Sequence, residues 1–352
     1  MGTARFTIEV RPPFRLDLTV WALRRRPHNT IDAWDGTTYT RTLLAEGTPL
    51  LVAVRQQPDG GPGRVRLAVE LRRRGEAPSE AGRAEVRRTL EQMLGLGIDL
   101  VGFHELVAAD DRLAGLAKRF RGVRPPRFAS VFEALVNAVA CQQLSLTVGI
   151  HLLDRLAAVY GPEVALRGAR PGFPTAERLA AAEPSHLRRL GFSLTKARTL
   201  VGLARRVAAG TLDLDALAQA DDEAATAALV ALPGIGRWSA EYVLLRGLGR
   251  LGVLPGDDVG ARNNLRRRFE LPASAGYDEV VALAEGWWPY GGLVYFHLLL
   301  DALAVAGHLE AAAPAPAPAP SAEGPAASHA VSVTSDSRRS AASAELGAGD
   351  RA

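Results

Sequence analysis

Two adjacent aspartates, Asp257 and Asp258, are the first candidates for chemistry in this sequence of 352 residues. The residues that follow, Val259–Phe269, have the apolar spacing of a helix, so the pair lies at a predicted helix start. The helix dipole favours an ionised carboxylate there. Such a group can stabilise a developing cation or polarise an attacking water, and it is a poor proton donor. A metal pair is the alternative, but no histidine or further carboxylate accompanies the two aspartates at a useful spacing.

A glycine hairpin precedes this pair. The string Leu232–Ala240 reads Leu-Pro-Gly-Ile-Gly-Arg-Trp-Ser-Ala and joins two helical patterns. Its proline ends the first helix, while Gly234 and Gly236 permit backbone conformations that are closed to other residues. The second helix then begins with unpaired N–H groups beside Arg237 and Ser239, and a DNA phosphate could bind there whatever the base sequence. The alternative is a tight corner between two helices.

Two aromatic residues, Trp238 and Tyr242, lie one turn apart on the helix that follows the hairpin. Electron-rich aromatic faces attract cations, so the pair could bind a positively charged ligand. The alternative is that both rings pack in the core. We expect His297, which lies within an apolar helical pattern, to be a buried structural histidine and not a catalytic base.

The bulk composition narrows the class of protein. The chain has 42 Lys and Arg against 38 Asp and Glu, a net charge of +4, and basic runs such as Arg24–Arg26 and Arg266–Arg268. This excess fits a polyanionic partner without proving one. The single cysteine, Cys141, excludes a disulfide framework, a zinc cage and a cysteine-ligated iron–sulfur cluster. The sequence has no signal-peptide pattern and no apolar run near the roughly 20 residues that span a bilayer, so we expect a cytoplasmic protein.

The patterns along the chain indicate the α+β class, with two folded domains and a tail. Residues 1–112 read as a mixed α/β domain whose antiparallel sheet has one wet face. A turn is expected at Pro58–Gly63, and a helix over Ser79–Leu94 is expected to cover the other face. The predicted strands are Phe6–Val10, Tyr39–Leu44, Leu50–Val54 and Arg64–Leu71.

Residues 113–310 have helical periodicity almost throughout and predict an all-α domain. Helices are expected at 131–139, 152–159, 176–183, 195–209, 221–232, 237–247, 259–269, 277–286 and 293–307. Residues 311–352 are rich in Ala, Pro and Ser and lack the apolar residues of a core, so we expect a disordered tail.

Several motifs together resemble the helix-hairpin-helix (HhH-GPD) DNA glycosylase superfamily. The string Leu232–Ala240 resembles its hairpin, and Pro255–Gly260 places Asp-Val-Gly where that superfamily has its essential aspartate. Trp287–Tyr290, followed by His297, resembles its C-terminal Trp-x-Pro-aromatic element. The opening Pro12–Phe14 and the mixed N-terminal domain resemble the 3-methyladenine DNA glycosylase II branch, over roughly residues 5–308.

The resemblance implies a base excision repair enzyme whose partner is double-stranded DNA that contains damaged bases. It makes Asp258 the catalytic carboxylate, which stabilises the cationic sugar as the base leaves, and Asp257 the N-cap of the next helix. The segment that enters the DNA stack is matched by Ala140–Ser145. The wedge that replaces a flipped base is then one of Gln142, Gln143 and Leu144, unless the glutamines brace the preceding helix.

Position 238 bears on the type of reaction. Related bifunctional enzymes carry a lysine there, which forms a Schiff base with the sugar and nicks the strand, whereas this chain has Trp238. The resemblance therefore implies a monofunctional enzyme that releases the base by hydrolysis and leaves an abasic site. Trp238 and Tyr242, with Trp21, would line a base cleft for cationic alkylated purines of the 3-methyladenine type. Another lesion (an oxidised or mismatched base) and a non-catalytic damaged-DNA-binding protein are the alternatives.

Three departures from the family pattern concern the range of bases. Gly291 stands where the family has an arginine, Leu299 replaces a cleft tryptophan, and Ala22 aligns with a cleft aromatic while Trp21 is adjacent.

The expected reaction requires no cofactor. The resemblance implies a structural monovalent cation, Na⁺ or K⁺, at the hairpin, and it implies a monomer that acts at the bacterial nucleoid. The cation would be held by the backbone carbonyls of Val230, Leu232 and Gly234.

Overall fold

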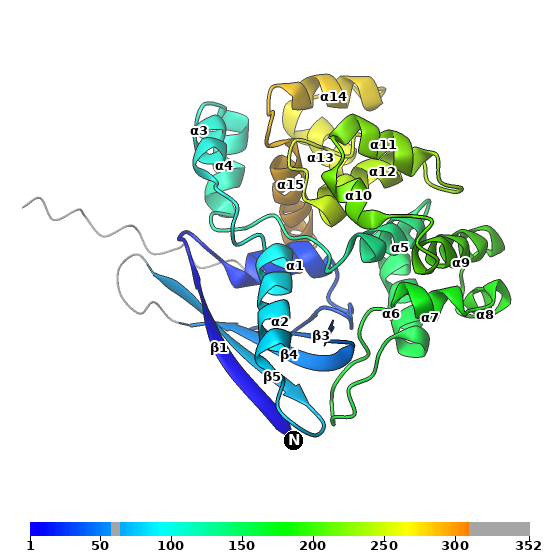
Figure 1. Ribbon diagram of the computed structural model, residues 1–352. Coiled ribbons are helices and arrows are strands. Elements are labelled where there is room, and N and C mark those ends of the chain that lie inside the picture. Colours follow the sequence, from blue (N-terminus) through cyan, green and yellow to red (C-terminus); the bar gives the residue numbers. More distant parts are fainter. Residues whose placement is uncertain (58–63, 310–352) are drawn as a thin grey trace, which may run out of the picture. The chain divides into compact units, whose positions relative to one another are not determined.

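The structure is a computed structural model of the chain, and it describes residues 1–57 and 64–309 (Figure 1). The described residues belong to one compact unit. The turn predicted at Pro58–Gly63 and the disorder predicted over 311–352 lie outside the described residues. Within the described ranges, no helix is both long enough and apolar enough to cross a membrane.

A five-stranded antiparallel sheet forms the N-terminal part, in the order β1-β5-β4-β3-β2. The strands are β1 (Gly2–Val10), β2 (Ala33–Trp34), β3 (Thr38–Ala45), β4 (Thr48–Gln56) and β5 (Val65–Arg73). Four of them confirm the predicted strands to within a few residues, and the short β2 has no counterpart among the predictions. Every second residue of β5 from Val65 to Leu71 is buried, because successive side chains of a strand point to opposite faces.

Helix α2 (Glu80–Met93) covers one face of the sheet, as predicted (Figure 1). Its N-cap Ser79 accepts a hydrogen bond from the first turn, and its buried side carries Val86, Leu90 and Met93.

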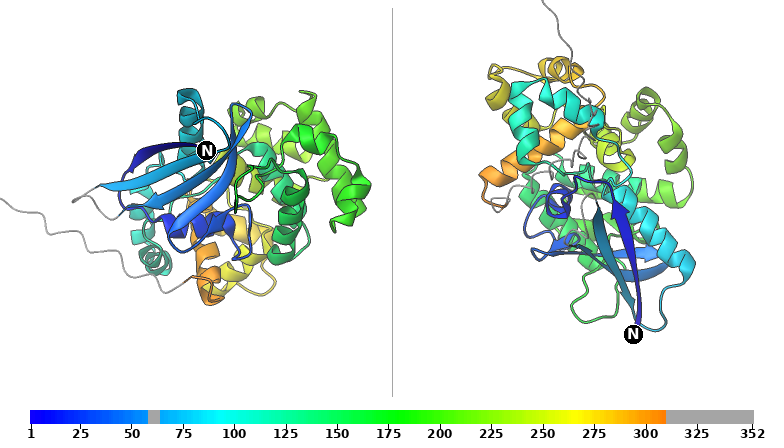
Figure 2. Two further views of the ribbon diagram at one scale, coloured as in Figure 1. Left: turned by 90° about the horizontal axis from the view of Figure 1, so that it is seen from below. Right: turned by 90° about the vertical axis from the view of Figure 1, so that its left-hand side faces the viewer.

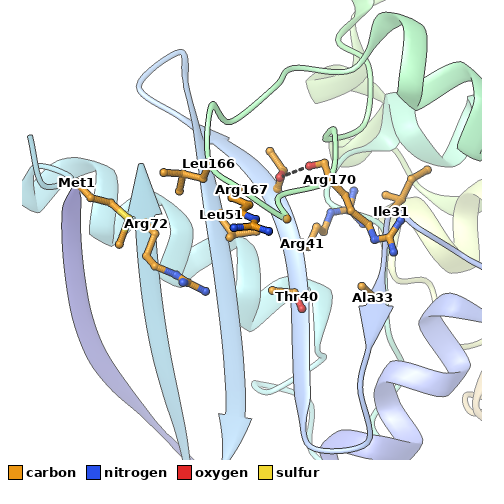
Figure 3. A pocket seen from close by; sticks show the side chains of 12 residues that line it. Met1, Ile31, Ala33, Thr40, Arg41, Leu51, Arg72, Leu166, Arg167 and Arg170 are labelled. Atoms are coloured by element: carbon orange, nitrogen blue, oxygen red, sulfur yellow. Dashed lines mark hydrogen bonds between the residues drawn. The ribbon is translucent and has the colours of Figure 1, made fainter. Parts of the chain in front are cut away.

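The sequence predicts that the opposite face of the sheet is exposed to solvent, and this prediction is wrong because part of the face is covered. Six of the eight residues of β3 are buried. The segment between α6 (Leu146–Tyr160) and α7 (Ala176–Ala180) crosses this face, and the Thr42 hydroxyl donates a hydrogen bond to the Arg170 carbonyl at 2.6 Å. A cavity of about 310 Å³ lies between this segment and the strands (Figure 3). Long-range packing of a loop is invisible to an alternation pattern, which reports one strand at a time.

A buried ionic group ties the sheet to the first long helix of the all-α part. Arg41 of β3 donates to Asp32 at 2.7 Å and to Glu133 at 2.5 Å, and all three side chains are 1–3% exposed. The Tyr39 hydroxyl also donates to Asp32, at 2.8 Å. Because both carboxylates are paired, their burial is tolerated.

Outside the sheet, the regular elements of the described residues are helices, and from α5 on their order follows the predicted all-α pattern. The elements are α1 (Leu16–Arg24), α3 (Val101–Ala108), α4 (Asp111–Arg119), α5 (Val131–Cys141), α6 (Leu146–Tyr160), α7 (Ala176–Ala180), α8 (Pro184–Arg189), α9 (Leu194–Ala208), α10 (Leu214–Gln219), α11 (Asp222–Val230), α12 (Arg237–Val243), the π-helix η1 (Leu244–Leu248), α13 (Val259–Phe269), α14 (Tyr277–Glu285) and α15 (Gly291–Val305). The predictions lack α1, α3, α4, α8 and α10 and merge α12 with η1.

Two apolar clusters hold these elements. One joins the sheet to the helices from α5 to α12, and the other joins one side of α1 to α3, α4 and α13–α15. In Figure 1 and in the right-hand view of Figure 2, the sheet lies at one end of the described part and α13 and α14 lie at the other. The boundary predicted between residues 112 and 113 falls within α4, and neither cluster follows it, so the division into domains stays a prediction.

Candidate active site

The hairpin connects α11 to α12, as the sequence predicts, but its two glycines differ. Gly234 has a φ of +82°, and a Cβ there would lie 2.5 Å from the Thr199 hydroxyl oxygen. Gly236 has a φ of −96° and a ψ of 177°, which any residue can adopt, and a Cβ there would meet nothing within 4 Å. The prediction that both positions need glycine for backbone reasons is therefore wrong for Gly236. The buried side chains of Leu232 and Ile235 anchor the turn in the core.

The first turn of α12 faces outward from this hairpin. Gly236 is the N-cap, and no side chain supplies a capping hydrogen bond among the described residues. The backbone N–H groups of the first turn are therefore available to an outside acceptor. Ser239, in contrast, is 2% exposed.

Gln142 braces the hairpin from the end of α5. Its side-chain amide donates to the Gly234 carbonyl at 2.9 Å and to the Ser239 hydroxyl at 2.8 Å. Gln143, which has a φ of 53°, and Leu144, which is 42% exposed, project beyond this brace. The structure thus separates the three candidate wedge residues, since Gln142 is engaged with protein and the other two side chains are free to meet a ligand.

Lys196 of α9 supports the same corner, and sequence reasoning missed it. Its ammonium donates to the carbonyls of Ala140, at 3.0 Å, and Gln142, at 2.5 Å. These carbonyls belong to the last turn of α5 and to its C-cap residue, where a helix has no intrahelical donors for them.

Asp258 is the N-cap of α13, a role that the sequence analysis gave to Asp257. One carboxylate oxygen, Oδ1, accepts a hydrogen bond from the Ala261 N–H at 2.8 Å. The other, Oδ2, lies 3.3 Å from both the Trp238 indole nitrogen and the Tyr295 hydroxyl. The side chain is half-buried. The helix start and two neutral donors therefore hold the Asp258 carboxylate beside the helix that leaves the hairpin.

Asp257 has a different partner, which explains the exchange of roles. It accepts from Arg237 at 2.9 Å across the gap between two helices. The Arg237 guanidinium carbon also lies 3.5 Å from the centre of the Tyr277 ring. Because Arg237 is held by these two contacts and is 52% exposed, it is a fixed positive charge at the start of α12.

Glu241 secures the loop that carries both aspartates, and sequence reasoning missed it as well. It is 8% exposed and accepts from the Tyr277 hydroxyl at 2.6 Å and from the Gly256 N–H at 3.2 Å. Burial raises the pKa of this carboxyl. Burial and the bond to Glu241 raise the pKa of Tyr277 to about 12. Glu241 lies within a run of buried residues of α12, which the sequence alone does not reveal.

The predicted aromatic pair is present, with unequal exposure. The Trp238 and Tyr242 rings lie 5.3 Å apart with a 30° tilt, and Trp238 is half-buried. Tyr242 is 3% exposed, and its hydroxyl accepts from Arg25 at 2.6 Å. Arg246, which is fully buried, lies 5.8 Å from the Tyr242 ring centre. Tyr242 is thus covered and already faces two protein cations, so Trp238 is the ring of the pair that a ligand can reach.

Three further predictions concern Trp21, the run Arg24–Arg26 and His297. Trp21 stacks with His308 at 6.3 Å and lies under Arg24, and among the described residues no ring contact or hydrogen bond joins it to Asp258. The run Arg24–Arg26 is not a basic surface, because its first two side chains are 5% and 4% exposed. His297 is buried as expected, and burial lowers its pKa to about 4.

Comparison with known proteins agrees with this arrangement. Residues 136–290 match the family model of the HhH-GPD superfamily base excision DNA repair protein. A DNA-3-methyladenine glycosylase of Bacillus subtilis (strain 168) is 29% identical over 61% of this chain and 72% of its own length. DNA-3-methyladenine glycosylase 2 of Escherichia coli (strain K12) is 34% identical over 50% of this chain and 60% of its own length.

A solved structure extends the likeness to most of the described chain. The 3-methyladenine DNA glycosylase from Archaeoglobus fulgidus superposes with a TM-score of 0.74 at 27% identity, over 84% of this chain and 97% of that one. The family match includes the hairpin, Asp258 and the segment from Trp287 to Tyr290. The sequence match to the HhH-GPD superfamily of base excision DNA repair proteins thus covers residues 136–290, and the likeness of the fold covers most of the chain.

Proposed function

We propose that the protein is a monofunctional DNA glycosylase that flips an alkylated purine out of duplex DNA and hydrolyses its N-glycosidic bond. The observation that carries this proposal is the position of Asp258, a half-buried carboxylate beside the first helix after the hairpin. A protein that only binds DNA has no physical need for an anion at that place, because an anion repels the phosphate backbone.

The proposed reaction follows from the charge of this carboxylate. The bond between C1′ of the sugar and the base nitrogen breaks, and its electron pair leaves with the base. The sugar becomes cationic, and the negative charge of Asp258 stabilises it. A water polarised by the same carboxylate then bonds to C1′, and the proton that it loses passes to solvent. A fixed group of this kind typically contributes about 2.7–4 kcal/mol to barrier lowering.

The side chain at position 238 supports hydrolysis over strand cleavage. Trp238 offers no amine, so no Schiff base with the sugar can form there. Its indole N–H instead points at the Asp258 carboxylate, 3.3 Å away. Base release then leaves an intact strand with an abasic site.

The choice of alkylated purines rests on charge. A purine alkylated at N3 or N7 carries a positive charge, which an aromatic face attracts, and it is already a good leaving group. Trp238 offers the accessible face, whereas Tyr242 and Trp21 are engaged with other side chains. The names of the relatives, DNA-3-methyladenine glycosylases, support the same substrate class.

The hairpin and the end of α5 form the proposed DNA-binding surface. The N–H groups after Gly236 take a phosphate, with the fixed charge of Arg237 beside them. Gln143 or Leu144 fills the space of the flipped base, while Gln142 supports the hairpin. A Na⁺ or K⁺ ion held by the carbonyls of Val230, Leu232 and Gly234 completes this DNA-binding surface. The carbonyls of Leu232 and Gly234 each accept one hydrogen bond, from Ile235 and Gln142, and each keeps a second lone pair.

A base-release assay tests the proposed function. The enzyme is incubated with duplexes that contain N3- or N7-methylated purine, oxidised guanine, a mismatch or no lesion, and each product is analysed with and without alkali. We expect methylated purine to be released and the strand to break after alkali alone. Release of another lesion in its place would refute the substrate class, strand cleavage without alkali would refute hydrolysis, and binding without release would refute the enzyme.

We further propose that the protein acts as a monomer in the cytoplasm, on the bacterial chromosome. One flipped base needs one active site, so the reaction does not call for symmetry. The bacterial relatives support this setting.

A further inference from the structure

Two histidines and an aspartate meet on the surface of α6, away from the hairpin. His151 and Asp154 lie one turn apart on this helix, and His28 approaches from the segment between α1 and β2. One donor atom from each of the three residues lies within 4.8 Å of the others. The two imidazole rings are stacked, with 3.9 Å between their centres.

One ring nitrogen of His28 and one carboxylate oxygen of Asp154 remain available to a ligand. His28 Nε2 is buried and has no hydrogen-bond partner among the described residues. Asp154 uses one oxygen, Oδ1, for both the N–H and the hydroxyl of Thr30, at 2.9 and 2.8 Å. Thr30 therefore orients the carboxylate and leaves its second oxygen to another ligand. A buried ring nitrogen with no partner is costly unless something occupies its lone pair.

We propose that His28, His151 and Asp154 bind a divalent transition-metal ion, with Zn²⁺ as the best match. Imidazole and carboxylate ligands suit Zn²⁺ and its neighbours, whereas Mg²⁺ and Ca²⁺ prefer oxygen ligands. Zinc bonds of about 2.0–2.1 Å place the donors of a tetrahedral site about 3.3 Å apart. The donor atoms need to close by about 1.5 Å at most. The exposed His151 ring must also turn out of its stack on His28, so that the nitrogens of both rings point at the ion.

The fourth ligand of this ion comes from solvent. The cluster lines a cavity of about 570 Å³, together with Arg155 and Arg170. Three protein ligands and one open position are the arrangement of zinc sites that exchange water or a small anion. The positive charges of the two arginines lower the affinity of the site for a cation.

Such an ion would link the N-terminal part of the chain to α6. The segment that carries His28 also carries Arg25, which donates to Tyr242 behind the candidate active site. It carries Arg26 as well, whose guanidinium donates to the Thr147 hydroxyl at the start of α6. Bonds to the ion would add to this contact between Arg26 and Thr147. They would stabilise the folded state, because the unfolded chain does not hold the three ligands together.

Metal binding to the full chain tests the proposal. The protein is freed of metal with a chelator and titrated with Zn²⁺ and with Co²⁺, whose visible absorption reports nitrogen and oxygen ligands directly. The variants are His28→Gln, His151→Ala and Asp154→Asn. The matched control is His186→Ala, which removes an exposed histidine from α8. Melting temperatures are measured with and without Zn²⁺, and Mg²⁺ serves as the control ion.

We expect one Zn²⁺ per chain, a Co²⁺ spectrum of a low-symmetry site and a higher melting temperature with Zn²⁺ but not with Mg²⁺. Removing a supporting group of a metal site costs about 10- to 100-fold in affinity, so loss of a ligand should cost at least that much. His186→Ala should bind like the wild type. A wild-type chain without a Co²⁺ spectrum, or His151→Ala with unchanged affinity, would overturn the proposal. Because His151 is exposed, its loss should not unfold the chain.

Discussion

A methyl group placed on Gly234 or on Gly236 tests the hairpin geometry, because the two positions differ in strain and in space. At Gly234 the left-handed backbone costs an alanine about 1–2 kcal/mol. Its Cβ would lie 2.5 Å from the Thr199 hydroxyl oxygen, an overpacking that typically costs about 1–3 kcal/mol. The lower entropy of the unfolded alanine chain returns about 0.4–1 kcal/mol. We expect Gly234→Ala to lower the free energy of unfolding by about 1–4.6 kcal/mol.

Gly236→Ala should leave stability unchanged or slightly raised, because its backbone is extended and a Cβ would meet nothing within 4 Å. The same methyl group would obstruct a phosphate at the N–H groups of α12. Loss of a hydrogen bond to a charged group costs about 1.5–3 kcal/mol, so affinity for duplex DNA should fall about 10- to 100-fold.

Urea unfolding and duplex binding, measured on both variants at one salt concentration, separate the two effects. Thr199→Ala added to Gly234→Ala should recover the steric part of the loss and not the backbone part. Equal stability losses in the two glycine variants would refute the assigned backbone geometry. Wild-type DNA affinity in Gly236→Ala would refute the phosphate contact.

Three further predictions concern stability. Tyr277→Phe leaves the buried Glu241 without one of its donors and keeps the ring under Arg237, so urea unfolding should show a loss of about 1–3 kcal/mol, and an unchanged midpoint would contradict this. Arg41→Met leaves two buried carboxylates without their cation, so the free energy of unfolding in the same assay should fall by about 3–5 kcal/mol. An unchanged free energy of unfolding would show that the buried ionic group is dispensable. Burial lowers the pKa of His297 from 6.5 to about 4, so the folded chain binds fewer protons than the unfolded chain between these pH values. The stabilising contribution of the neutral His297 is present above pH 6.5 and is lost as the pH falls toward 4. His297→Gln should therefore flatten the slope of the free energy of unfolding against pH over this window.

The sequence was sufficient for features that local chemistry determines. The strands follow from the alternation of apolar and polar residues. The hairpin follows from Pro-Gly-Ile-Gly between two segments with the apolar spacing of a helix. The position of Asp258 followed from the resemblance of Pro255–Gly260 to the superfamily. Both aspartates are good N-caps by local rules, however, and the choice between them depends on Arg237, which reaches Asp257 from another helix.

Features that depend on long-range packing were not predictable. The run Arg24–Arg26 looks like a basic surface in sequence, yet Arg25 is 4% exposed because Tyr242 and Asn137 lie beside it in space. The π-helix after α12 continues an apolar pattern, so periodicity cannot distinguish it from an α-helix. Glu241 has no local signal for a role, since its two donors belong to Gly256 and Tyr277, which lie 15 and 36 residues away.

The role of Asp258 is tested most directly by the single-turnover rate of methylated purine release in Asp258→Asn. The matched control is Asp221→Asn, because Asp221 caps α11 through the Ala224 N–H as Asp258 caps α13. Asparagine is also a good N-cap, so both variants should keep their helices, their melting temperatures and their affinity for duplex DNA. We predict that Asp258→Asn slows release by about 100- to 1,000-fold and that Asp221→Asn releases at the wild-type rate. Release by Asp258→Asn at the wild-type rate would contradict the account.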